Sequence, residues 1–468
     1  MAKHSTTTCH SNLRVVHDIE TTSDRLTSRA GLTLFSRYLR GIEIFPHLDR
    51  LFGSLRKSRK GQPVVEVFKQ IFCFFLDGSD RHLVSFDALK SDSGYAGAVE
   101  SAPEQLLSSH AVKRFFYAFR PYRIWLFRYL LHQLFLWRVR IEKPRVIVLG
   151  IDSMVMDNDE ACCREGVSPT YKRVKGFHPL QVTWDRFIID AVFRGGKKHS
   201  NHSDTVEKTI RHLIRKIRRR YCPKVPIVIR LDSAFFDQKL LEVLEELDIG
   251  YIVAGKLYED IRDYVSRLEP SAWQSYENQH RQWHYVELGD RRGTWNRFRR
   301  ALFCRPLYED TQRLLEFARP DQILYTNLGC GTAVDDQFRQ AGLPGLLNAE
   351  AVIAGYHDRG RDELVHRALK DFASETLPFR RFLANAAFYY TMLVAFFLYE
   401  SFKQDVCRTV VPVTCYATTL RRRILDVAGK IVRHAGRILL KVTESAWKQL
   451  HMETLWHYSG DPPPFHWV

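Results

Sequence analysis

The 468-residue sequence lacks the patterns that mark small modules held together by metal ions or disulfides. Its nine cysteines include no C-x-x-C pair and show no regular spacing. A zinc module or a disulfide framework is therefore not expected, and reduced thiols in a cytoplasm are the simpler interpretation. The opening stretch "MAKHSTTTCHSNLRVVHD" has no apolar segment of the kind found in secretory signals, and the sequence has no internal repeat or low-complexity segment.

Long hydrophobic runs are also scarce. The most apolar stretch, "FLANAAFYYTMLVAFFLY" at residues 382–399, approaches the length of a membrane span. It contains Asn385 and two adjacent tyrosines, and it follows a highly charged segment. We therefore expect a buried core helix here, with a membrane span as the alternative.

Acidic residues are outnumbered by basic ones. The sequence has 53 Asp and Glu against 70 Lys and Arg, which gives a formal net charge of +17. A charge of this size is typical of proteins that meet a polyanion, so nucleic acid is the first candidate partner and an anionic membrane the second. With 45% hydrophobic residues, a chain of this length can fill more than one core, and two to four domains are expected.

The first third of the sequence is predominantly helical by its apolar periodicity. Residues 30–140 repeat apolar side chains at helical spacing, and a basic loop, "SLRKSRKGQP", interrupts them at 54–63. A helical DNA-binding domain and a helical packing domain are equally consistent with this pattern, because no specific helix-turn-helix signature is readable.

The pattern changes after Pro144 to that of a mixed α/β domain. Two apolar, β-branched runs, "RVIVLGIDS" and "PIVIRLDS", each end in Asp-Ser, at Asp152 and Asp232. Between them the sequence predicts a hairpin and a helix, and after them another helix and a short strand. The all-apolar runs indicate strands buried on both faces of a sheet.

Two further segments differ from this core. Residues 256–345 read as short strands with glycine-bearing turns, which predicts an all-β insertion. Residues 421–442 place apolar side chains on one helical stripe, which predicts a basic helical tail whose opposite face carries Lys430, Arg433, Arg437 and Lys441.

Acidic residues at strand ends suggest a metal site. Carboxylates at the carboxyl ends of neighbouring strands can converge at one sheet edge, and a later helix can add a third. Mg²⁺ prefers such hard oxygen ligands, and two ions held this way support in-line phosphoryl transfer. In the charged segment "YHDRGRDELVHRALK", residues 356–370, a helical wheel places Glu363 among bases on the face opposite an apolar stripe.

The same segment carries a specific spacing. Tyr356 is followed after two residues by Arg359, then after three by Glu363 and after six by Lys370. With the two upstream aspartates, this resembles the DDE transposases of bacterial insertion sequences that carry the YREK signature, over about residues 145–400.

The resemblance implies a fold, a site and a cofactor. It implies an RNase H-like mixed α/β core with flanking helices in which Asp152, Asp232 and Glu363 are catalytic and bind Mg²⁺, with Mn²⁺ able to substitute. It implies that Tyr356, Arg359 and Lys370 bind DNA phosphates. The chain then divides into five parts, namely a helical DNA-binding domain (1–140), the first part of the core (141–255), the β-rich insertion (256–345), the second part of the core (346–405) and a basic helical C-terminal region (406–468).

The implied function is cut-and-paste transposition. The protein would bind the terminal inverted repeats of its element, free 3′-hydroxyls and join them to target DNA, acting as a homodimer or synaptic oligomer in a bacterial cytoplasm at the nucleoid, without a membrane partner. A host-adapted nuclease of the same fold is one alternative. The other is a DNA-binding repressor without turnover, against which the intact acid triad argues.

Several nearby residues are expected to have ordinary roles. Trp283 and Trp295 are interpreted as core tryptophans, with base stacking as the alternative. The run "RKIRRR" at 215–220 is either a solvated helix face or a DNA contact. Four acids lie off the pattern and are expected to be solvated or to cap helices: Asp157, Asp159, Asp237 and Asp358.

Overall fold

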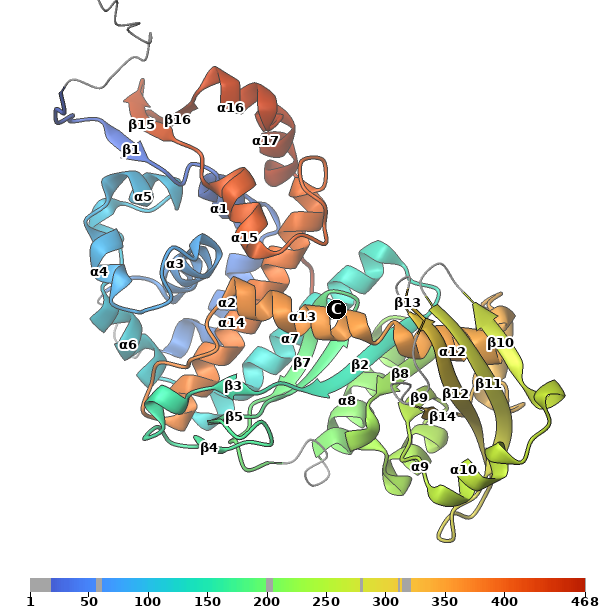
Figure 1. Ribbon diagram of the computed structural model, residues 1–468. Helices are drawn as coiled ribbons and strands as arrows, with labels where there is room; N and C mark the ends of the chain where they lie inside the picture. The colour runs from blue at the N-terminus through green and yellow to red at the C-terminus, as the bar shows by residue number, and fades with distance from the viewer. Residues whose placement is uncertain are drawn as a thin grey trace, which may run out of the picture.

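The computed structural model describes residues 18–55, 61–198, 205–277, 281–309, 312–313 and 321–467. A helical body and a sheet body lie side by side, and the sheet body ends in a projecting β-rich part (Figure 1).

The helical body confirms the expected helical character of residues 30–140. Ser108 caps the sixth helix by accepting a hydrogen bond from the Ala111 backbone N–H at 3.2 Å, and Pro121 opens the seventh, where its missing N–H costs no hydrogen bond. Gly78, at a φ of +58°, ends the third. The helices are α1 (Leu32–Gly41), α2 (Ile44–Phe52), α3 (Val64–Asp77), α4 (Ser85–Lys90), α5 (Ser93–Ala98), α6 (Ser109–Tyr117) and α7 (Pro121–Glu142).

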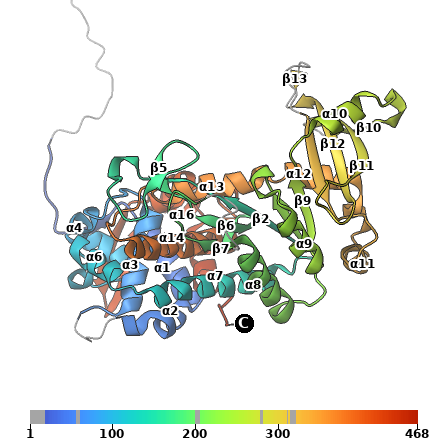
Figure 2. The ribbon, with the colours of Figure 1, turned by 90° about the horizontal axis from the view of Figure 1, so that it is seen from below.

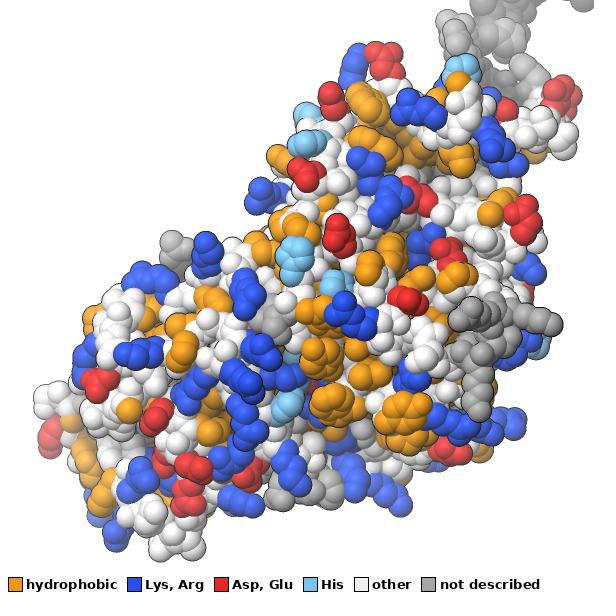
Figure 3. Space-filling view, turned by 180° about the vertical axis from the view of Figure 1, so that it is seen from behind, with side chains coloured by type: hydrophobic (Ala, Val, Ile, Leu, Met, Phe, Trp, Pro, Cys, Tyr) orange, Lys and Arg blue, Asp and Glu red, His pale blue; other side chains and the backbone are white. Residues whose placement is uncertain are grey.

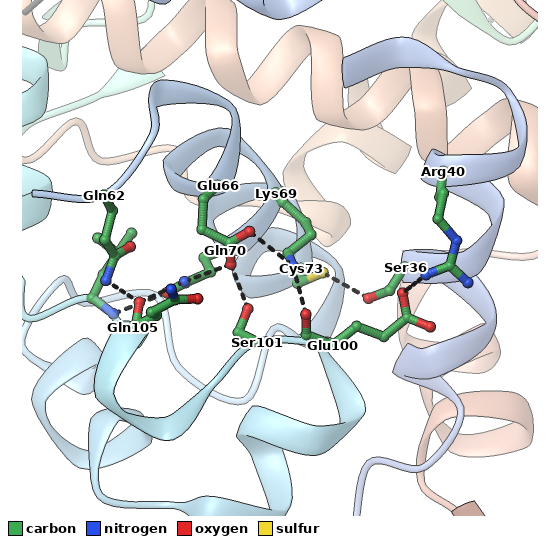
Figure 4. A network of polar contacts seen from close by, with 11 residues as sticks. Ser36, Arg40, Gln62, Glu66, Lys69, Gln70, Cys73, Glu100, Ser101 and Gln105 are labelled. Carbon is green, nitrogen blue, oxygen red and sulfur yellow. Dashed lines mark hydrogen bonds and ion pairs between the residues drawn. The ribbon is translucent and has the colours of Figure 1, made fainter. Parts of the chain in front are cut away.

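A polar network ties the loop after α5 to α3 inside this body (Figure 4). The Lys69 ammonium donates to the Glu100 carbonyl at 2.9 Å and pairs with the Glu66 carboxylate at 2.9 Å. The Gln70 amide donates to the Gln105 carbonyl at 2.9 Å and accepts from the Leu107 N–H at 2.9 Å. These bonds satisfy backbone groups that the loop would otherwise bury without partners.

The predicted order of strand, hairpin, helix, strand, helix and strand is confirmed in the sheet body. Strand β2 (Ile147–Ser153) pairs in parallel with β8 (Ile227–Leu231), which pairs in parallel with β9 (Gly250–Ala254). On its other side β2 pairs antiparallel with β6 (Leu180–Trp184), which forms a hairpin with β7 (Phe187–Val192). The two predicted helices are α8 (Thr205–Arg220) and α9 (Gln238–Glu246).

The β-rich stretch is not the all-β insertion that the sequence suggested. Its strand β14 pairs antiparallel with β9 through Leu324 and Ala254, so its strands extend the core sheet and form no separate one. The edge of β9 that does not pair with β8 supplies the backbone partners for this extension. The stretch also contains two helices, α10 (Glu259–Ser266) and α11 (Ala333–Gln340). Its strands are β10 (Gln274–Glu277), β11 (Arg281–Asp290), β12 (Arg299–Glu309), β13 (Gln312–Arg313) and β14 (Gln322–Thr326).

Helices α12, α13 and α14 are the first three α-helices after the β-rich stretch. Helix α12 (Ala349–His357) and helix α13 (Gly360–Phe372) run across one face of the sheet, while α7 and α8 lie toward the opposite face (Figure 2). Helix α14 (Phe382–Phe402) packs against α7, α3 and β7. In the described residues it is the one helix long and apolar enough to cross a membrane, and 89% of its most apolar stretch is buried inside the protein. This burial agrees with the expected core helix.

The C-terminal region contradicts the predicted basic helix. Residues 429–442 form a hairpin of β15 (Gly429–His434) and β16 (Arg437–Val442), so Lys430, Arg433, Arg437 and Lys441 lie on strands. Ala435 and Gly436, at φ of +49° and +76°, form the two-residue turn that a hairpin favours and a helix cannot contain. A short N-terminal strand, β1 (Arg25–Thr27), completes this sheet, and the helices α15 (Ala417–Leu420), α16 (Glu444–Gln449) and α17 (Met452–Gly460) flank it.

Candidate acidic site

Asp152 and Asp232 lie side by side at the carboxyl ends of two parallel strands. The register pairs Ile151 of β2 with Leu231 of β8, so the next residue on each strand is an aspartate. Burial raises the pKa of both carboxyls, and the charge of Asp152 further raises the pKa of Asp232. The protein thus holds two mutually repelling carboxylates at one sheet edge, an arrangement that a cation would stabilise.

Helix α13 is anchored over this sheet by a buried acid that the sequence pattern did not reveal. Asp362 is 3% exposed, accepts a hydrogen bond from the Thr183 hydroxyl at 3.1 Å and pairs with the Arg230 guanidinium at 3.1 Å. Gly150, on β2, leaves room for it, because a Cβ there would stand 2.5 Å from the Asp362 Cγ. In the sheet register Gly150 pairs with Arg230 on one side and with Thr183 on the other. Three adjacent strands thus each contribute one residue to the surroundings of the Asp362 carboxylate.

The Glu363 side chain, next to the anchored Asp362, is 66% exposed. Between Glu363 and the strand-end acids lies the Arg359 guanidinium, with nitrogens 3.6 Å from a Glu363 oxygen and 3.9 Å from an Asp152 oxygen. The charge of Arg359 also lowers the pKa of Asp232 against the effect of burial. Arg359 is therefore the shared counter-ion of the three acids.

His366 lies one helical turn beyond Glu363, and its buried side chain is next to the Asp152 carboxylate. Its Nδ1 is 3.9 Å from the same Asp152 oxygen, and burial lowers its pKa to about 4. A neutral imidazole thus packs against Asp152 near neutral pH, and the balancing positive charge comes from Arg359.

The structure brings together five of the six predicted site residues. Tyr356 lies beside Arg359, whose guanidinium carbon is 5.9 Å from the Tyr356 ring. Lys370, by contrast, lies two turns further along α13, and its ammonium is 2.9 Å from Glu375. The expected single helix through 356–370 is wrong: α12 ends at His357, α13 begins at Gly360, and Arg359 occupies the N-cap between them.

Other predictions about individual residues are confirmed, with one exception. Trp283 and Trp295 are both buried. Asp237 caps α9 by accepting from the Leu240 N–H at 3.0 Å. The expectation of a solvated or capping acid is not confirmed for Asp157, which is half-buried on β3 (Met156–Asp157) and accepts a local hydrogen bond from the Asp159 N–H at 2.9 Å.

The acids fit a hard divalent cation by their chemistry. Three carboxylates are the donor set that Mg²⁺ or Mn²⁺ prefers. Within the part of the chain that the structure describes, no three His, Cys, Asp or Glu side chains are close enough to hold a metal ion together. The exposed Glu363 and the intervening Arg359 account for this, because Asp152 and Asp232 are already neighbours.

A cavity of about 630 Å³ opens beside the two aspartates. Its lining includes the two aspartates and also Tyr171, Gly196 and Lys197. None of the residues Tyr171, Gly196 and Lys197 was predicted from the sequence as part of the site. The available signal was the cluster of basic and aromatic residues in "TYKRVKGFH", residues 170–178, directly downstream of the first acid.

Comparison with known proteins places this geometry in context. A family model described as "Transposase DDE domain group 1" matches residues 10–457. Among solved structures, the chain is similar to one in a cryo-EM structure of the piggyBac transposase synaptic complex with hairpin DNA. The two share 12% sequence identity and a TM-score of 0.40, over 84% of this chain and 79% of that one. None of the curated proteins matches the sequence.

Proposed function

The chain belongs to the Transposase DDE domain group 1 family, and on this premise we propose that it is a DNA transposase that binds the terminal inverted repeats of its own element, cleaves there and joins the ends to target DNA. The observation that carries the proposal is the convergence of Asp152, Asp232 and Glu363 around Arg359 at the carboxyl ends of β2 and β8. The mixed sheet supports assigning the core to the RNase H-like class, with its two parts at 141–255 and 346–405.

Asp152, Asp232 and Glu363 are the proposed ligands of Mg²⁺, for which Mn²⁺ would substitute. When bound at such a site, the divalent metal lowers the barrier to phosphoryl transfer by activating the attacking oxygen and stabilising the leaving one. The strands fix the positions of the two aspartates, and the Asp362 anchor fixes the helix that carries Glu363. The chain therefore presents two rigid ligands and one that can adjust.

The signature bases are the proposed contacts to DNA phosphate. Arg359 is held against the acids by charge alone, at distances of 3.6–3.9 Å, without a hydrogen bond to them of normal length. A phosphate entering the site would offer this guanidinium a two-point partner, which is stronger than the present contacts. Tyr356 lies beside it, and Lys370 would have to leave Glu375 to join them.

The wider surface suits a polyanion. Figure 3 views the molecule from behind and shows many Lys and Arg side chains gathered on the lower half of this face, toward which α7 and α8 lie. Exposed cations of α8 contribute: Lys208, Arg215, Arg219 and Arg220. We assign this surface and the helical region 1–140 to DNA binding, which makes binding strongly salt-dependent.

The proposal extends to assembly and location. Joining two ends requires that two active sites meet, so a homodimer or larger synaptic assembly on double-stranded DNA is proposed. The spacing from Tyr356 to Lys370 supports membership among the bacterial insertion-sequence transposases with the YREK signature, and hence a cytoplasmic protein at the nucleoid.

The test is cleavage and joining of repeat-end DNA by purified variants in Mg²⁺ and in Mn²⁺. Asp152→Ala, Asp232→Ala and Glu363→Ala should each abolish both steps and leave repeat binding intact, because each change also removes a negative charge beside the phosphates. Asp157→Ala and Asp358→Ala are the matched controls and should retain activity.

The outcomes separate the alternatives. A triad variant that still cuts at the wild-type rate would remove that acid from the site. A wild-type protein that binds repeats tightly and cuts in neither metal would instead be a repressor, and one that cuts without joining ends would be a nuclease.

A further inference from the structure

A small hairpin lines the same cavity as the two aspartates. It consists of β4 (Ser168–Pro169) and β5 (Lys175–Phe177), with β3 beside β5, and we call residues 168–177 the cavity hairpin. Its tip carries Tyr171, Lys172 and Arg173, all of them exposed. The tip therefore presents one aromatic and two cationic side chains near three carboxylates.

The base of the cavity hairpin is closely fitted to the segment that follows β7. Gly196 lies so near the Ser168 and Gly176 carbonyls that a Cβ would stand 2.2–2.4 Å from their oxygens. The Lys197 N–H donates to the Ser168 hydroxyl at 2.9 Å, and the Gly196 N–H donates to the Gly166 carbonyl at 3.1 Å. These contacts fix the base, so the tip is held at a defined distance from the acids.

The tip itself is closed by a tight turn. The Thr170 N–H and hydroxyl both donate to the Val174 carbonyl, at 2.9 and 2.8 Å, and the Arg173 N–H donates back to the Thr170 carbonyl at 3.0 Å. Arg173 adopts a φ of +62°, which costs a non-glycine residue conformational energy. The turn directs Tyr171 into the wall of the cavity and leaves 65% of its surface exposed.

Tyr171 is electrostatically part of the acidic site. Burial raises the pKa of its phenol, and the charges of Asp152, Asp232 and Glu363 raise it further. The ring packs on His178, with centroids 5.3 Å apart, and the Lys172 ammonium is 5.9 Å from the ring centroid. The charge of Lys172 also lowers the pKa of Asp152 against the effect of burial, so this cation lies near the acid centre as well.

From this arrangement we infer that the cavity between the acids and the cavity hairpin is the binding site for a single DNA strand, in which Tyr171 stacks on the base next to the scissile phosphate and Lys172 and Lys197 contact the flanking phosphates. A flat aromatic face beside cations is the combination that binds single strands irrespective of sequence. A volume of about 630 Å³ is enough for one unpaired nucleotide. The inference rests on the proposed function and adds the form of the substrate, an unpaired end, and the residue that positions it.

The experiment uses full-length protein carrying Asp152→Asn, so that DNA stays uncut, and repeat-end duplexes with 2-aminopurine at the nucleotide beside the scissile phosphate. In the parent, binding should change the probe's fluorescence because the base leaves its stack and packs on the Tyr171 ring. Tyr171→Ala should abolish this change and weaken binding of the unpaired end by about 5- to 150-fold, the range observed for one lost base stack. Tyr171→Phe should preserve both signals because it keeps the ring.

Tyr264→Ala is the matched control, since Tyr264 is also an exposed tyrosine (53%) and lies on α10, outside both the cavity lining and the surface assigned to DNA binding. Each variant is first compared with the parent by thermal melting. Unchanged fluorescence and affinity in Tyr171→Ala, with Asp152→Ala still blocking cleavage in the otherwise native protein, would overturn this inference and leave the proposed function standing. A parent that fails to bind repeat ends at all would instead overturn the proposed function.

Discussion

Replacing Asp362 tests whether the acidic site depends on a buried anchor. The carboxylate is 3% exposed and binds the Arg230 guanidinium and the Thr183 hydroxyl, each at 3.1 Å. Asp362→Ala leaves the guanidinium buried without its counter-ion. Removing one partner of such a pair costs about 3–5 kcal/mol, because the remaining charge has lost its solvent and its ion.

This cost should appear as a lower melting temperature. At about 2–4 °C for each kcal/mol in a body of this size, the change is roughly 6–20 °C. Asp362→Asn keeps the shape and one acceptor oxygen but also removes the counter-ion of Arg230, so it should keep most of the loss. The double variant Asp362→Leu with Arg230→Leu should recover most of the loss, since an apolar pair of similar volume leaves no buried charge.

The assay is thermal melting followed by strand cleavage at a temperature where every variant is folded. Asp358→Ala, four residues before Asp362 and exposed, is the control. Cleavage by the anchor variants should fall even when they are folded, because α13 then holds Glu363 less firmly. A fall of less than about 2 °C in Asp362→Ala, or no recovery in the double variant, would show that the reasoning about the buried charge is wrong.

Three further outcomes are expected. Gly150→Ala should lower the free energy of unfolding by about 1–3 kcal/mol, because the new Cβ overpacks against the buried Asp362 carboxyl. Gly293→Ala is the control, since a Cβ there meets nothing within 4 Å. Urea unfolding measures both changes. Because burial raises the pKa of Glu400 to about 7, its contribution to stability is present below its unfolded pKa and lost as pH rises through about 7. Glu400→Gln should flatten the fall in melting temperature between about pH 5 and 8, and an unchanged slope would contradict this. Asp152→Asn and Asp232→Asn should raise the melting temperature at pH 8, with a smaller gain at pH 5. Mn²⁺ should raise the melting temperature of the wild type, and both variants should lose this rise.

The core strands could be predicted because their signals are local. β2 and β8 are apolar runs that stop at an aspartate, and the parallel register that aligns Asp152 with Asp232 follows once they are neighbours. The Glu363 position came from the spacing of the signature. The adjacent Asp362 was missed because its role depends on Gly150 and Arg230, which lie on strands that only the fold brings beneath it.

The other misses also come from non-local pairing. In residues 421–442 the apolar side chains fit both a helical stripe and two strands, and only the turn at Ala435 and Gly436 distinguishes them. The extension of the core sheet depends on β14 finding the edge of β9, about 70 residues earlier in the chain. Sequence patterns describe the faces of strands and carry little information about which edges pair.

The pairing of β1 with β15 has a consequence for how the protein is made. Arg25 pairs with Ile431, about 400 residues later, and α1 packs against α17. At ribosomal rates of about 5–20 residues per second, β1 waits roughly 20–80 s for its partner strand to be synthesised. The helical body can therefore be completed only near the end of translation. A product that stops short of residue 429 would leave β1 without its partner strand. The N-terminal strand can therefore take its place in a sheet only after the C-terminal hairpin has been synthesised.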